Sequence, residues 1–270
     1  MEYVLLSIHL AIFSCLSIPG FKEYNGGPMK VFITNLLFIS LFILLNGCSE
    51  NFFMSNRYES TSSESKVIAL SGQTEFTIEN TNGNIVISTS DTAKSIYCKI
   101  DKKVKSSESE EDANAHLSDI NVNTTKNGTG VKIKVTNPNS DGRSYEIRFD
   151  IVMPDNFNYN LNLGNGDISV NSITRNLVIN IGNGNADADV DLNDNCNVSI
   201  SIGNGSIDFK IPGSTNASFN AEVGNGSVSN NGLSFENIHS NSRTLSGKLG
   251  SGSGSIDLSV GNGSIAVSGK

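Results

Sequence analysis

The sequence predicts an all-β protein built from short repeats, with one short helix in its N-terminal part. Apolar and polar residues alternate with a period of two over most of the chain from Lys66 onward, which is typical of half-buried strands. A Gly-Asn-Gly motif recurs in the second half of the chain. The acidic segment 106–117 interrupts the strand pattern, and its carboxylates near the amino end favour a short helix through the helix dipole.

The strands expected before the repeats are joined by recognisable turns. Thr81-Asn82-Gly83-Asn84 predicts a turn, because Asn and Gly accept positive φ angles at low cost. Pro138 to Gly142 predicts another. The alternating apolar segments on either side of these turns are 67–70, 76–78, 85–87, 96–100, 131–135 and 145–153.

The Gly-Asn-Gly motif sets the expected architecture of residues 161–270. Successive motifs lie roughly 20 residues apart, counted between the first glycines of the first four. Each step holds two alternating strands, such as 198–202 and 207–211, and units of this length bury a core by stacking on their neighbours. We therefore expect a β-solenoid of about 20-residue coils, with the motif asparagines stacked at one corner. The motif residues are Gly164, Asn165, Gly166, Gly182, Asn183, Gly184, Gly203, Asn204, Gly205, Gly224, Asn225, Gly226, Gly261, Asn262 and Gly263.

An antiparallel β-meander or sandwich is the alternative architecture, because Asn-Gly between alternating apolar segments is also a strong hairpin signal. A variant motif at 249–256 begins only about half a step before the last motif, counted from Gly250 to Gly261, which strains a model with one motif per coil. The last motif runs almost to Lys270, so we expect no C-terminal cap and an open strand edge.

The N-terminal part of the chain has the pattern of an export signal. Met29-Lys30 supplies a start and a positive charge, and an apolar run follows from Val31 to Leu45. This run is short for a membrane span, which needs about 20 residues. The ending Leu45-Asn46-Gly47-Cys48 resembles the lipobox of bacterial lipoproteins. That resemblance implies that Cys48 becomes the mature N-terminus and carries acyl chains, which hold the protein to a membrane.

These patterns divide the chain into five parts. Residues 1–28 are expected to be a non-native extension, because translation can start at Met29 and the codons of Gly26-Gly27 can form a ribosome-binding sequence; a genuine second apolar segment is the rival interpretation. The remaining parts are a lipoprotein signal peptide at 29–47, the lipidated cysteine and a Ser-rich flexible tether at 48–65, an N-terminal β region with the helix at 66–160, and the repeat region at 161–270.

Composition excludes several classes of function. The net charge of −8 argues against nucleic acid, whose binders carry basic patches. Three histidines are too few for a typical zinc site. The sequence has neither a nucleophile elbow nor a dinucleotide-binding motif, so we expect a non-enzymatic protein without a cofactor. Cys98 and Cys196 each share a face with aliphatic residues, which favours buried free thiols over a disulfide.

Four aspartates are the only weak metal candidates. Asp187, Asp189 and Asp191 share an outward face, and Asp208 can extend the row from the next coil. Oxygen ligands suit Ca²⁺. A solvated face that keeps the protein soluble accounts for the same pattern, so we expect no metal site.

The repeats and the segment before them resemble a bacterial family of candidate adhesins. The features that carry the resemblance are the acidic helix before Ile120, the run from Tyr145 to Pro154, and the first repeat from Gly164 to Val170. The chain also looks like the head domain of candidate auto-transporter adhesins. The resemblance spans roughly 67–267 and implies a β-repeat fold with a role in adhesion and no catalytic residues.

Taken together, the patterns predict a lipoprotein of the bacterial cell envelope that faces outside the cytoplasm and binds through its β-repeat domain. Its expected partners are the membrane, through the lipid anchor, and a protein or glycan surface. The alternatives are a structural or envelope-stress component that self-associates through its open end, and a weak calcium-binding β-repeat protein.

Overall fold

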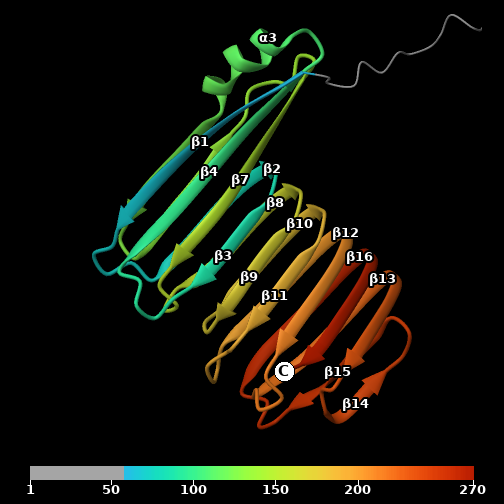
Figure 1. Ribbon diagram of the computed structural model, residues 1–270. Helices are drawn as coiled ribbons and strands as arrows, with labels where there is room; N and C mark the ends of the chain where they lie inside the picture. Colours follow the sequence, from blue (N-terminus) through green and yellow to red (C-terminus); the bar gives the residue numbers. More distant parts are fainter. Residues whose placement is uncertain (1–57) are drawn as a thin grey trace, which may run out of the picture. The chain divides into compact units, whose positions relative to one another are not determined.

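The computed structural model describes residues 58–270, which are mostly in strands, with one short α-helix among them (Figure 1). The all-β class predicted from the alternation is therefore confirmed. The helix, α3, runs from Glu110 to Ala115 and is followed by a 3-10 helix at His116–Asp119. Residues 1–57 lie outside the described part, and with them the predicted extension, signal peptide and lipidation site at Cys48.

The strands belong to one hydrogen-bonded sheet. In chain order they are β1 (Tyr58–Ala69), β2 (Glu75–Asn82), β3 (Ile85–Thr89), β4 (Ser95–Ser106), β5 (Asn121–Asn127), β6 (Gly130–Thr136), β7 (Arg143–Met153), β8 (Asn158–Asn165), β9 (Ile168–Ile173), β10 (Leu177–Asn183), β11 (Ala186–Val190), β12 (Asn197–Ile211), β13 (Ala217–Asn231), β14 (Glu236–Ser240), β15 (Thr244–Leu249) and β16 (Gly254–Gly269).

The sheet has two rows of strands that meet at the Asn-Gly corners. Row A includes the strands before the corners, and its order is β5-β6-β2-β8-β10-β12-β16-β13-β15-β14. Row B includes the strands after the corners, and its order is β1-β4-β7-β3-β9-β11-β12-β16-β13. The long strands β12, β16 and β13 continue through the corner and so belong to both rows.

Successive repeats pair in parallel with equivalent residues opposite one another. Asn183 of β10 lies opposite Asn165 of β8 on one side and Asn204 of β12 on the other. An antiparallel meander would instead place the two strands that flank each motif side by side as a hairpin. The repeats are therefore not hairpins, although Asn-Gly is also the residue pair that hairpins prefer.

The spatial order of the coils differs from their order in the chain. β16, the last strand, lies between β12 and β13 and is parallel to both (Figure 1). In chain order, β13 is followed by β14 and β15, which form antiparallel pairs at its side. The chain then returns, and β16 lies between β13 and β12.

This order corrects two expectations. The C-terminal motif is not an open edge, because β16 has a neighbour on each side in both rows; between its neighbours it buries five apolar side chains, Ile256, Leu258, Val260, Ile265 and Val267. The variant motif is not a corner either, because Gly250 and Gly252 lie in the turn between β15 and β16. The last motif therefore offers no open strand edge through which two copies of the protein could pair.

The core lies between the two rows, and alternate residues of nearly every strand point into it. Its largest fully buried side chains include Phe76, Phe149, Phe157 and Phe209. Full burial of one such side chain contributes roughly 1.5–3 kcal/mol. β2 pairs directly with β8, and β3 pairs directly with β9. The rows and their core are therefore continuous between the N-terminal β region and the repeat region, which the sequence patterns divide at residue 160.

The N-terminal edge also differs from the prediction. The flexible tether was expected to extend to residue 65, but residues 58–65 pair with β4 as the first part of β1. Ile68 is the only buried side chain of this strand. An edge strand can be held by backbone hydrogen bonds on one side, so a Ser-rich sequence forms it without the apolar alternation that signals a strand.

Helix α3 is fixed to the strands by the partly buried carboxylate of Asp112. Its N-cap is Ser109, whose hydroxyl accepts the backbone N–H of Asp112. The Asp112 carboxylate accepts from Nε and Nη2 of Arg143 at 2.7 and 2.5 Å and from the Ser106 hydroxyl. These bonds lower the pKa of Asp112 to about 2, with Arg143 the largest cause.

Candidate functional site

The two glycines of each motif are required by the close stacking of the corners. The second glycine has a φ between +126° and +144° in all five motifs, a conformation that L side chains rarely adopt. A Cβ on Gly184 would overlap the backbone oxygen of Gly166 in the preceding coil. A Cβ on the first glycine, Gly182, would lie 2.5 Å from the backbone oxygen of Gly164. The motif glycines are therefore explained by packing.

The asparagine between the glycines forms a side-chain ladder along the corner. Each Nδ2 donates to the Oδ1 of the next coil at 2.8–2.9 Å, and the ladder runs from Asn225 through Asn262, Asn204, Asn183 and Asn165 to Asn82. Asn82, which is not one of the predicted motif residues, ends the ladder by donating to the backbone oxygen of Tyr145 at 3.3 Å. The structure thus brings the motif asparagines together, and they use their hydrogen-bonding groups on one another.

The four candidate metal ligands lie near one another, but each of them forms an ion pair with one of two lysines. Lys210 Nζ lies 3.3 Å from the Asp187 carboxylate and 3.9 Å from that of Asp208. Lys270 Nζ contacts Asp189 and lies 3.0 Å from Asp191. The Asp187 carboxylate raises the pKa of Lys210, so this ammonium stays charged. Within residues 58–270 no group of three or more His, Cys, Asp or Glu side chains is placed to hold a metal ion.

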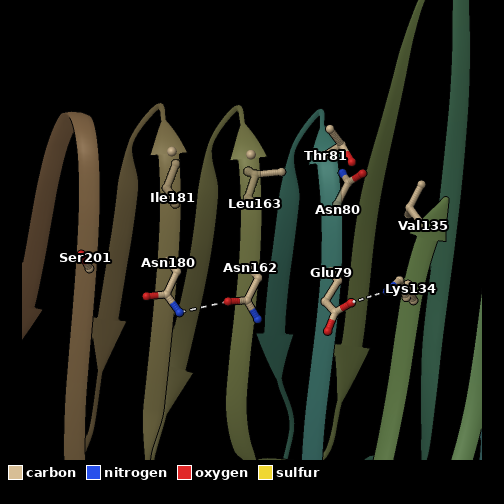
Figure 2. Close-up of a pocket in the computed structure, with 12 residues that line it drawn as sticks. Glu79, Asn80, Thr81, Lys134, Val135, Asn162, Leu163, Asn180, Ile181 and Ser201 are labelled. Atoms are coloured by element: carbon tan, nitrogen blue, oxygen red, sulfur yellow. Dashed lines mark hydrogen bonds and ion pairs between the residues drawn. The ribbon is translucent and has the colours of Figure 1, made fainter. Parts of the chain in front are cut away.

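The outer face of row A carries a polar hollow of about 500 Å³ that the sequence did not single out (Figure 2). One line of residues crosses it from strand to strand, each directly opposite the next: Lys134 of β6, Glu79 of β2, Asn162 of β8, Asn180 of β10 and Ser201 of β12. The hollow therefore spans five neighbouring strands of row A.

The hollow exists because two positions in the next line of residues are glycines. Beyond Asn162 and Asn180 the outward positions are the first glycines of two motifs, Gly164 and Gly182, and the adjacent position on β2 is Thr81. The backbone at these glycines forms the floor. Leu163 and Ile181, whose side chains point into the core, lie beside it (Figure 2).

Hydrogen bonds order the side chains around the hollow. Asn180 Nδ2 donates to Asn162 Oδ1 at 2.9 Å, and Asn162 Nδ2 donates to Asn160 Oδ1 at 2.9 Å. The Glu79 carboxylate accepts from Lys132 at 2.5 Å and lies 3.3 Å from Lys134 Nζ. The hydrogen bond from Lys132 is the largest cause that lowers the pKa of Glu79, so the carboxylate is ionised at neutral pH.

A buried amide lies on the core side of row A next to the hollow, because Asn80 is opposite Leu163 in the pairing of β2 with β8. Asn80 is only 6% exposed and lies where the pairing of β2 with β6 ends. Its Nδ2 donates to the backbone oxygens of Ile147 at 2.9 Å and Asn82 at 3.1 Å. Its Oδ1 has no partner among the described residues. Since both partners of Nδ2 can only accept, the orientation of the amide is defined.

The outer face of row B has a different character. Three exposed apolar side chains lie in one line on β1, β4 and β7, namely Val67, Tyr97 and Val152, with exposed fractions of 61%, 52% and 45%. They line a second hollow of about 480 Å³. The polar residues Lys99 and Asp150 lie opposite each other on β4 and β7 and also line this hollow.

The described residues contain two cysteines. Cys98 and Cys196 are both free thiols, as predicted, although Cys196 is only partly buried. Burial raises the pKa of Cys98 to about 12, so it carries almost no thiolate at neutral pH.

No helix within residues 58–270 is long and apolar enough to cross a membrane.

The two-row fold and its corner ladder define a class of β-repeat proteins, and comparison with known proteins gives the family. The model of the Toastrack DUF4097 family matches residues 45–268, and the chain belongs to this family. No curated protein matches the sequence significantly.

Solved structures are similar to this chain at low sequence identity, and the first of them shares its fold. A candidate cell adhesion protein from Clostridium sporogenes has a TM-score of 0.54 and 18% identity, and the similarity covers 78% of this chain and 100% of that one. A candidate adhesin from Bacteroides fragilis has a TM-score of 0.27 and 11% identity, with 78% and 98% of the two chains covered. A candidate adhesin from Parabacteroides merdae has a TM-score of 0.23 and 12% identity, with 78% and 97% covered.

Proposed function

We propose that this protein is a cell-envelope lipoprotein, anchored through Cys48, whose β-repeat domain binds a protein or glycan surface without catalysing a reaction. The observation that carries the proposal is the polar hollow on row A. It presents ordered amide and charged groups on adjoining strands, but no nucleophile paired with a base lines it. Such a surface is suited to recognition.

The fold supports a recognition role because it is a rigid scaffold. Parallel strands in register, the corner ladder and a core shared by both rows hold the outer side chains at regular spacing. We propose that the repeats form a β-solenoid with coils of about 20 residues. The register supports this coil length, because Asn180 lies opposite Asn162 on one side and Ser201 on the other. Family membership and the fold shared with the Clostridium sporogenes protein support an adhesin-like role.

The proposed anchor is compatible in length with a surface position. The segment 49–57 separates Cys48 from the start of β1 at Tyr58. At about 3.3–3.6 Å per residue, an extended segment of this length reaches roughly 30 Å. A segment of this length keeps the start of β1 within roughly 30 Å of the proposed anchor.

Protease treatment of intact cells, comparing the wild type with Cys48→Ala, tests the location. We expect the wild-type domain to be cleaved on intact cells, and the variant to be released or to remain unprocessed. A domain that is protected until the envelope is opened would contradict surface exposure and favour a role inside the envelope. Adhesion of protein-bearing cells to protein- and glycan-coated surfaces then tests binding itself, with cells lacking the protein as the control.

A further inference from the structure

We propose that Asn127, in the turn between β5 and β6, is a modification site at which the folded protein loses ammonia and acquires an aspartate or an isoaspartate. The site is independent of the proposed binding function. An asparagine followed by glycine is chemically labile, because glycine has no side chain to shield its backbone nitrogen. Such dipeptides begin, among the described residues, at Asn82, Asn127, Asn165, Asn183, Asn204, Asn225, Asn231 and Asn262.

The reaction needs only the dipeptide and water. The backbone nitrogen of the glycine attacks Cγ of the asparagine, so a bond from this nitrogen to Cγ forms and the bond from Cγ to Nδ2 breaks. The amide hydrogen of the glycine leaves with Nδ2 as ammonia, and a cyclic imide remains. Water then opens the imide at either carbonyl group, which gives aspartate or isoaspartate. The asparagine side chain must therefore be able to rotate, and the glycine N–H must be free.

The asparagine ladder blocks this reaction at the corners. At Asn183, Nδ2 donates to Asn165 at 2.9 Å and Oδ1 accepts from Asn204 at 2.8 Å. The N–H of Gly184 donates to the backbone oxygen of Asn204 at 2.9 Å. One hydrogen bond corresponds to a factor of about five in the rate, so these bonds together slow the reaction roughly a hundredfold. Asn225, at the end of the ladder, is held less firmly, because no described residue donates to its Oδ1.

Asn127 has none of these restraints. It is exposed, and it is the last residue of β5, opposite Gly130 on β6. No described residue forms a hydrogen bond with its side-chain amide or accepts the N–H of Gly128. The hydrogen bond that reaches the turn from Gln73 Nε2, at 3.4 Å, goes to the backbone oxygen of Gly128 and leaves this N–H free. Both requirements of the reaction are met here.

Asn231 offers an internal comparison, because it is equally exposed but lies beside a braced turn. The neighbouring Asn230 donates from Nδ2 to the backbone oxygen of Leu233 at 2.9 Å, and its Oδ1 accepts the N–H of Leu233 at 3.2 Å. These bonds close the turn around Gly232 and restrict the rotation of its peptide group. We therefore expect Asn231 to react more slowly than Asn127 and faster than Asn183.

The fold tolerates the product at the turn but not at the corners. A carboxylate at position 183 would present a second acceptor to Oδ1 of Asn165, where Nδ2 now donates. At the turn, by contrast, no described atom lies within 4 Å of the position that a Cβ on Gly128 would take. The extra main-chain methylene of isoaspartate therefore has space there. The stacked corners thus confine the reaction to a position where the sheet survives it.

Incubation of the full-length protein in detergent at mildly alkaline pH tests the inference. Peptide mass spectrometry at successive times measures the conversion of amide to carboxylate, and enzymatic methylation detects isoaspartate. We expect Asn127 to convert roughly a hundredfold faster than Asn183 in the folded protein. In urea, where no ladder exists, we expect the two sites to convert at similar rates.

A variant of the ladder tests the reason for the protection. Asn204→Ala removes the donor to Oδ1 of Asn183 but keeps the backbone oxygen that accepts from Gly184. Conversion at Asn183 should then rise about fivefold. Asn220→Ala, at an exposed position of β13 outside the ladder, is the control and should leave this rate unchanged.

Two results would overturn the modification site. They are an Asn127 that stays intact in the folded protein, and equal rates at Asn127 and Asn183 before unfolding. An unchanged rate at Asn183 in Asn204→Ala would overturn the protective role of the ladder. None of these results bears on adhesion, which the cell-based experiments measure separately.

Discussion

The side-chain amide of Asn262 donates to Oδ1 of Asn204 at 2.8 Å, although the two asparagines lie far apart in the chain. Asn262 lies on β16, and Asn225, which precedes both β15 and β16 in sequence, donates to Asn262 from the far side. The order of the asparagines along the ladder is therefore the order in which the coils are stacked. It shows that the last strand is inserted between two earlier ones.

Removing one asparagine from the ladder will lower stability. Asn183→Ala deletes the hydrogen bonds to Asn165 and from Asn204, each contributing about 0.5–1.5 kcal/mol. We expect the free energy of unfolding in urea to fall by about 1–2 kcal/mol. Asn220→Ala, at an exposed position outside the ladder, is the control and should have little effect. Equal stability of the two variants would show that the ladder contributes nothing.

The second glycine of a motif will not tolerate a side chain. In Gly184→Ala the new Cβ meets the backbone of Gly166, and φ is +140°. We expect a loss of at least about 3 kcal/mol, or failure to fold, because the corner cannot relax without separating the coils. Gly213→Ala has open space around the added methyl group and is the matched control. Circular dichroism melting curves measure both, and a Gly184→Ala variant that melts like the wild type would refute the steric account.

Deletion of Gly254–Lys270 will disturb more than the end of the repeat array. β13 loses its parallel neighbour, and β12 loses a neighbour in both rows. We expect rapid proteolysis throughout residues 197–249, mapped by mass spectrometry, while β8 and β10 stay protected. If coils followed one another in chain order, only the terminal segment would be lost. Protection of β13 in the truncated protein would therefore contradict the inserted position of β16.

The Asp112–Arg143 pair will make part of the stability depend on acidic pH. The folded pKa of Asp112 is about 2, against an ordinary value of 3.8, so the unfolded chain binds its proton more readily. The stabilisation is complete above about pH 4 and is lost as the pH falls towards 2. The stability difference between the wild type and Asp112→Asn, measured by urea unfolding across this range, should shrink as the pH is lowered. A constant difference from pH 5 to pH 2 would contradict the assignment.

The sequence determined the local structure of this protein well. Alternating side chains predicted the strands from Lys66 onward, and the acids of segment 106–117 predicted the helix now seen at Glu110–Ala115. The regular steps between glycines predicted a repeat, because equivalent residues must be presented to equivalent neighbours. These features depend on contacts within a few residues or on a periodicity that can be counted.

The tertiary structure alone decided the order of the coils and the location of the hollow. Five motifs of nearly identical sequence can stack in more than one order, so nothing local indicates that β16 lies between β12 and β13. Glu79, Asn162, Asn180 and Ser201 each look like an ordinary solvated strand residue, and only the register of separate strands aligns them. The same glycines that were noticed as turn formers also leave the floor of the hollow open, because a missing side chain affects the surface only where neighbouring strands have been brought together.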